Sequence, residues 1–178
     1  MIRVALLLLL TVLGCTKRVE TPRAKTPAPH VKTVSTPSAP IRTDRSSYAL
    51  TNGPKGPEAT IVATLRAPAD RTLYIMNCNG ATGITLQRKV GEAWEWAWLI
   101  TMSACVSPPI VVPSGGEHTA QIRLHEEPGA VMPRRRIESG TYRVVWTGVL
   151  TSFDANAQGW GPELPLEERV SAPFTITR

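Results

Sequence analysis

The sequence predicts an all-β domain over residues 48–178, an antiparallel sandwich of about seven to eight strands. From Ala59 to Leu65, small or apolar residues occupy every second position, which is the period of a strand with one buried face. Similar β-rich runs follow, clusters of Gly, Pro, Asn, Asp and Ser separate them, and no helical period of useful length appears. Short strands spaced in this way are typical of sandwiches, so any helix should be minor.

Seven strands are expected along the chain. Each run is rich in β-branched, aromatic or alternating apolar residues, and most end at a cluster of turn-forming residues. In chain order the expected strands are Glu58–Leu65, Thr72–Cys78, Ile84–Val90, Trp94–Ile100, His118–Leu124, Thr141–Leu150 and Val170–Thr177.

Three phrases near strand starts resemble bacterial immunoglobulin-like domains of exported proteins. One reads as a hairpin with a tight turn, and two place a Pro-Gly or Ser-Gly turn before a strand. They are Leu86–Trp94, Val112–Ile122 and Ile137–Val144. The resemblance covers residues 58–177 and implies an immunoglobulin-like sandwich. It departs from antibody domains, because Val144 stands two residues after Tyr142, where an antibody domain has its second cysteine.

The first residues have the form of a secretory signal. A short positive start precedes the apolar run Val4–Leu13, which is too short to span a bilayer as a mature helix. The run ends in Val12-Leu13-Gly14-Cys15, which resembles the lipobox of bacterial lipoproteins. The resemblance implies that residues 1–14 are cleaved and that the Cys15 thiol is acylated.

This resemblance also implies a cellular location. Two or three acyl chains anchor a protein stably to a membrane. Thr16, rather than Asp, follows the lipidated cysteine, which implies the outer membrane, facing the periplasm, in a diderm organism. In a monoderm the domain would lie at the outer face of the plasma membrane. We therefore expect a lipid-anchored protein of the cell envelope.

Residues 15–47 are expected to form a flexible tether. The segment has few large apolar residues and repeats Thr-Pro and Ala-Pro pairs, which favour extended, uncollapsed chain. At about 3.1 Å per residue, some thirty residues reach on the order of 90 Å. A solvated spacer is the favoured interpretation, although its Lys and Arg residues are also suited to anionic surfaces.

The positive charge of the chain lies mainly in this tether. Of 20 Lys and Arg and 14 Asp and Glu residues, eight bases and two acids precede residue 48, which leaves twelve of each in the domain. Nucleic-acid binding usually concentrates basic residues on a folded domain. The sequence therefore does not predict a nucleic-acid partner.

Two cysteines remain if Cys15 carries lipid, and they lie in a compartment where disulfides persist. We expect a bond between Cys78 and Cys105, with two buried thiols as the alternative. The bond would tie the end of one strand to the loop from Met102 to Pro109. Such a loop is stabilised by roughly 3 to 4 kcal/mol in the chain-entropy model. Alkylation of both thiols under non-reducing denaturation would contradict it.

The chain contains no recognisable catalytic or phosphate-binding motif, so an enzyme, a cofactor and a metal are not expected. His118 and His125 are separated by an odd offset, which places them on opposite faces of one strand.

Alternation along Trp94–Ile100 places Trp94, Trp96 and Trp98 on one strand face and Glu95 on the other. The three indoles either belong to the core or form an exposed apolar platform for sugar rings or a partner's apolar patch. Glu95 argues against burial of its own face, which favours the core interpretation.

Two functional hypotheses follow. The first is a non-enzymatic envelope lipoprotein whose domain binds another envelope protein or a glycan, with the three tryptophans as the candidate ligand surface. The second is a protease-inhibitor-like module that uses the loop from Met102 to Pro109, which Pro108-Pro109 would stiffen.

Overall fold

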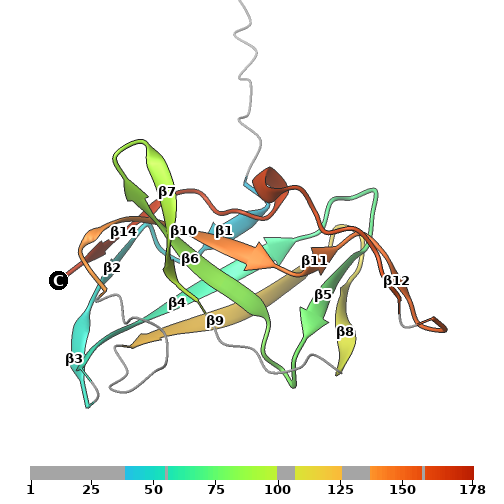
Figure 1. Ribbon diagram of the computed structural model, residues 1–178, viewed down its shortest axis with the longest axis horizontal. Coiled ribbons are helices and arrows are strands. Elements are labelled where there is room, and N and C mark those ends of the chain that lie inside the picture. The colour runs from blue at the N-terminus through green and yellow to red at the C-terminus, as the bar shows by residue number, and fades with distance from the viewer. Residues whose placement is uncertain (1–38, 55, 100–106, 126–136, 158) are drawn as a thin grey trace, which may run out of the picture. The chain divides into compact units, whose positions relative to one another are not determined.

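The computed structural model describes residues 39–54, 56–99, 107–125, 137–157 and 159–178. Over these residues the chain consists of β-strands and one short 3-10 turn (Leu166–Glu168), so the all-β prediction is confirmed. The strands, most of them labelled in Figure 1, are β1 (Ile41–Thr43), β2 (Ser47–Ala49), β3 (Thr51–Gly53), β4 (Gly56–Arg66), β5 (Leu73–Asn77), β6 (Gly83–Val90), β7 (Ala93–Trp98), β8 (Ser107–Val112), β9 (Glu117–His125), β10 (Gly140–Thr147), β11 (Val149–Leu150), β12 (Phe153–Asp154), β13 (Gly159–Trp160) and β14 (Phe174–Thr177).

The first sheet is organised around β4. This strand pairs antiparallel with β9 over residues 58–66, and β1 and β3 share its opposite edge. Its alternating sequence buries Ile61, Ala63 and Leu65, whereas the residues between them are half-buried. The period of two in the sequence therefore reflects the pleat of this strand, in which successive side chains point to opposite faces.

The second sheet contains five strands in the order β2-β14-β10-β6-β7. Its pairs are antiparallel, except that β2 and β14 run parallel. The inner faces of the two sheets enclose one apolar core, and in Figure 1 β6 and β10 pass in front of β4 and β9. The largest fully buried side chains come from both sheets and include Trp146, Ile61, Leu65, Leu86, Ile122 and Ile176.

A smaller third sheet has the strand order β11-β5-β8 and follows the second sheet through the chain connection from β10 to β11. Only Gly148 separates β10 from β11, and its φ of +68° lies in the left-handed region. A Cβ atom there would also lie 2.9 Å from the sulfur of Met76 in β5. The close approach of β5 to this position therefore requires glycine. The β12–β13 hairpin follows this sheet in the chain.

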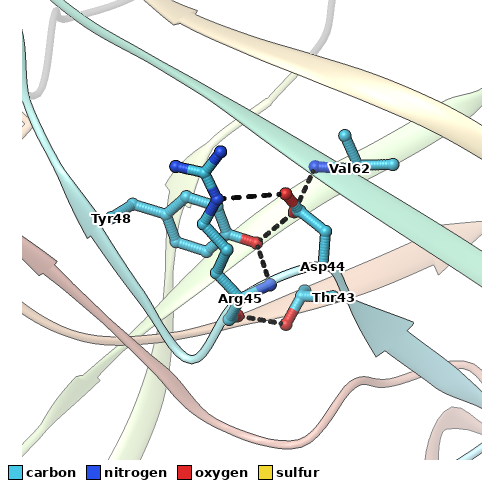
Figure 2. Close-up of polar contacts among 5 residues, drawn as sticks. All are labelled: Thr43, Asp44, Arg45, Tyr48 and Val62. Atoms are coloured by element: carbon cyan, nitrogen blue, oxygen red, sulfur yellow. Dashed lines mark hydrogen bonds and ion pairs between the residues drawn. The ribbon is translucent and has the colours of Figure 1, made fainter.

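The first strands join the core through a polar cluster at the turn between β1 and β2 (Figure 2). The Tyr48 hydroxyl donates a hydrogen bond to Asp44 Oδ1 at 2.6 Å, and the Val62 N–H donates to the same oxygen at 2.9 Å. The Asp44 N–H in turn donates to the Val62 carbonyl at 3.0 Å. This carboxylate therefore fastens the turn to the middle of β4.

Five of the seven expected strands are present near their expected bounds, as β4, β5, β6, β7 and β9, and the expected strand Thr141–Leu150 is divided at Gly148 into β10 and β11. The seventh, expected from Val170, begins only at Phe174 because Val170 and Ser171 form isolated bridges to Val145 and Ile41. The structure adds short strands that the sequence did not predict: β1, β2, β3, β8, β12 and β13.

Two of these additions fall where the sequence predicted irregular chain. β1 lies within residues 15–47, the range assigned to the tether, so the fold begins at least seven residues before Tyr48. β8 contains Pro108 and Pro109, which lack the N–H that a central strand needs. They are tolerated because β8 is an edge strand and the pair lies at a register shift opposite β5.

Candidate ligand-binding face

A bulge in β7 divides the tryptophan stripe. In the pairing with β6, Trp96 lies opposite Gln87 and Trp98 lies opposite Leu86, so Ala97 is an extra residue with no partner in the register. An extra residue in one strand reverses the alternation beyond it. Trp94 and Trp96 therefore share the outward face of the second sheet, whereas Trp98 turns to the inner face. The expectation that all three share one face is wrong.

The burial of the three indoles follows this division. Trp98 is half-buried and packs against the core, Trp94 is half-buried, and Trp96 is 44% exposed. The core interpretation is thus wrong for Trp96. A carboxylate argues against a buried face, but Glu95 lies opposite Arg88 in the register and lines an open cavity with it. A cation across the strand pair makes that position tolerable for a carboxylate.

Arg143, on β10, completes the outward face. Its guanidinium carbon lies 4.4 Å from the centroid of the Trp94 ring, and its Nε donates to Gln87 Oε1 at 2.8 Å. Because β6 lies between β10 and β7, this side chain crosses one strand to reach the indole. Burial lowers the pKa of Arg143, yet an arginine remains charged at any physiological pH. A cation over an indole is an attractive arrangement.

Gln87 lies at the centre of the row. It is 6% exposed although its position faces outward, and Trp96 and Arg143 are its direct neighbours on the two flanking strands. We call Trp94, Trp96, Gln87 and Arg143 the platform. Sequence alternation predicts only its tryptophans, because the contribution of β6 and β10 depends on strand order and register.

A cavity of about 390 Å³ lies on the other side of β6 and β7, toward the core. Both terminal nitrogens of Arg88 are engaged, in an ion pair with Glu138 and in a bond donated to the Ser139 carbonyl at 3.2 Å, whereas its buried Nε has no hydrogen-bond partner among the described residues. The Tyr142 hydroxyl donates to the Glu138 carbonyl at 2.6 Å. Arg88 and Tyr142 thus hold the turn that precedes β10.

The remaining predicted sites lie partly outside the described residues. Cys15 and Cys105 are outside them, so lipidation and the Cys78–Cys105 bond stay predictions; Cys78 itself is buried just after β5. Of the proposed inhibitory loop, Met102 to Val106 lie outside the described residues, and Ser107 to Pro109 belong to β8.

His118 packs against Trp146 with ring centroids 5.6 Å apart, and burial lowers its pKa. Within the ranges that the structure describes, no three His, Cys, Asp or Glu side chains gather as metal ligands. Those ranges also contain no helix with the length and apolar character needed to cross a membrane.

Comparison with known proteins found no protein-family model and no curated protein that matches the chain. Among solved structures, the chain is similar to the Pseudomonas fluorescens alkylpurine DNA glycosylase AlkC bound to DNA containing an abasic site analog. The two are 11% identical with a TM-score of 0.35, and the match covers 79% of this chain and 31% of that one. The chain therefore spans under a third of that protein, and a likeness at this level carries no argument about function.

Proposed function

We propose that this chain is a membrane-anchored envelope lipoprotein whose β domain binds another envelope component, a protein or a glycan, and has no catalytic role. The observation that carries the proposal is the platform, where Trp96 is 44% exposed beside the stack of Arg143 on Trp94. Trp96 lies exposed beside a second indole on the same face, and the two offer ring surface that a partner can cover. Trp and Arg are also the residues that most often dominate the energy of an interface.

The anchoring part of the proposal rests on the N-terminal sequence. The apolar run ending at Gly14-Cys15 supports lipidation at Cys15. In a diderm organism the proposed location is the outer membrane, with the domain facing the periplasm. The proline-rich segment that follows would hold the domain away from the bilayer. Mass spectrometry of the mature chain should find an acylated Cys15 at its N-terminus. An intact Met1 terminus or an unmodified thiol would contradict this part.

The strand order supports an immunoglobulin-like sandwich as the scaffold of the platform. Immunoglobulin domains place strands A, B and E in one sheet and G, F, C and C′ in the other. Here β4 pairs with β1 and β9, as B pairs with A and E, and the order β14-β10-β6-β7 matches G-F-C-C′. The bond from Tyr142 to the Glu138 carbonyl resembles the tyrosine corner of that fold.

Capture from a detergent-solubilised envelope, with the full chain as bait, tests the binding function. Trp96→Ala should abolish capture of the component that the wild-type chain retains. The same substitution should change the free energy of unfolding by no more than about 0.5 kcal/mol, as expected for a surface residue. A buried tryptophan would lose about 3 to 5 kcal/mol instead.

Trp160→Ala is the matched control. Trp160 is 38% exposed, lies in the β12–β13 hairpin and packs on Phe153, so its loss removes a similar apolar area elsewhere on the domain. The control should retain the captured component. Equal capture by wild type and Trp96→Ala would overturn the proposal that the platform is the binding surface.

A further inference from the structure

The face that carries the platform is positively charged as well as aromatic. The register assigns the outward positions of the strands around it. None of them is occupied by Asp or Glu: they are Trp94 and Trp96 in β7, Thr85, Gln87 and Lys89 in β6, and Thr141, Arg143 and Val145 in β10. The acid of β7, Glu95, lies on the opposite face across from Arg88. Two cations therefore share this face with two indoles.

Lys89 and Arg143 take part in no ion pair within the part of the chain that the structure describes. Arg42, Arg71 and Arg169, by contrast, each contact a carboxylate there. Residues 48–178 carry equal numbers of bases and acids, so the positive charge of this face is a local excess.

The arrangement fits a ligand in which an apolar ring face and an anionic group lie close together. An exposed indole stacks well against the C–H face of a sugar ring, and the planar guanidinium of arginine pairs in a bidentate manner with a carboxylate. Trp94 lies under the Arg143 guanidinium. Trp96 is two residues further along the same strand, so the two Cα atoms are about 7 Å apart. A sugar that bears a carboxylate on its ring presents an apolar ring face and an anionic group within this distance of each other.

We propose that the platform binds a carboxylated glycan, a polymer of sugars with ring-borne carboxylates, with sugar rings on Trp96 and carboxylates on Arg143 and Lys89. The inference rests on the proposed function, since it names the class of envelope component. Thr141 on the same face is half-buried and offers its hydroxyl to a sugar, whereas Thr85 and Gln87 are buried and bond within the sheet.

A single-stranded nucleic acid also combines flat rings with negative charge. Proteins that bind it provide a positively charged groove along several nucleotides, usually with several stacking side chains in succession. The described face offers only two cations and two indoles, which favours the shorter repeat of a charged sugar. Nucleic acid is accordingly a comparison ligand in the test.

Calorimetric titration of the full chain in detergent with polygalacturonate tests the inference. The wild-type chain should bind, and Trp96→Ala and Arg143→Gln should each weaken binding at least about tenfold. Arg143→Lys should weaken it less, because the charge remains while the bidentate geometry is lost. Trp160→Ala and Arg123→Gln, which alter an exposed indole and an exposed arginine elsewhere, should bind like wild type.

The comparison ligands are the fully methyl-esterified polymer, polyphosphate and oligothymidylate. The inference requires weaker binding to all three. It is overturned if the esterified polymer binds equally, if either phosphate polymer binds more tightly, or if polygalacturonate does not bind at all. In each of these cases the proposed function still stands if Trp96→Ala abolishes capture from the envelope, so the two failures are distinguishable.

Discussion

Two tyrosines lie against the same ring, Phe174, and each is held through its hydroxyl to the residue four positions earlier. Tyr48 packs edge-on at 5.3 Å between ring centroids, and Tyr142 stacks at 6.4 Å. Both hydroxyls donate at 2.6 Å, but Tyr48 donates to the Asp44 carboxylate and Tyr142 donates to the backbone carbonyl of Glu138. The same local geometry therefore uses a titratable acceptor in one place and a neutral acceptor in the other.

The difference appears in the pKa values of these groups. Burial alone would raise the pKa of Asp44, but the hydrogen bonds from Tyr48 and the Val62 N–H outweigh it, so this pKa is lowered. Burial and the bond to Asp44 raise the pKa of Tyr48 to about 12. Burial also raises the pKa of Tyr142, but its hydroxyl donates to a backbone carbonyl and not to a carboxylate. Only the Tyr48 site thus depends on a group that titrates in acid.

Removal of the shared ring should have the largest effect, because it affects both sites. Phe174→Ala leaves a cavity between the two tyrosines, and we expect a loss of about 3 to 5 kcal/mol in the free energy of unfolding. Urea denaturation measures this loss. A loss below about 1 kcal/mol would show that the two tyrosines do not depend on the ring between them.

Removal of each hydroxyl separates the two sites. Tyr48→Phe removes a bond to a charged acceptor and should lose about 1.5 to 3 kcal/mol, whereas Tyr142→Phe removes a neutral bond and should lose about 0.5 to 1.5 kcal/mol. The difference in urea midpoints at pH 7 measures the contrast. If Tyr142→Phe proves the more damaging, the charge of the acceptor is not what distinguishes the sites.

The pH dependence of stability sharpens the comparison further. Because the pKa of Asp44 in the folded chain lies below its ordinary value of 3.8, its contribution is fully present above that pH and is lost as the pH falls through the lowered value. The pKa of Tyr48 is raised, so its contribution to stability is fully present below pH 10 and is lost as the pH rises from 10 to about 12. Denaturation at a series of pH values should show that the difference between wild type and Asp44→Asn shrinks in acid. A difference independent of pH would contradict the assignment.

The smallest effect is expected at the other acid. The Glu138 side chain pairs with Arg88 near the surface, while the Tyr142 hydroxyl contacts only its backbone carbonyl. Glu138→Gln should therefore lose no more than about 1 kcal/mol, the usual limit for an exposed ion pair. Thermal denaturation of this variant is the matched control for Asp44→Asn. A loss as large as that of Asp44→Asn would mean that the carboxylate also holds the turn.

The sequence by itself determined most of the long strands. The alternation in β4 and the turn residues before β9 and β10 are local signals, since the pleat and the turn conformations depend on neighbouring residues. Short strands escaped prediction for the opposite reason. The three residues of β1 are too few to show a period, and Asp44 and Tyr48 hold them in place through contacts with β4 and β14.

The tertiary structure alone decided the candidate site. Alternation placed Trp94, Trp96 and Trp98 together, but the pairing of β7 with β6 inserts Ala97 as a bulge and turns Trp98 inward. Arg143 reaches Trp94 only because β10 lies two strands away from β7 in the same sheet. Register and strand order are set by partners far apart in the chain, which periodicity cannot reveal. The sequence therefore determined which residues form strands, and the packing of those strands determined which side chains meet.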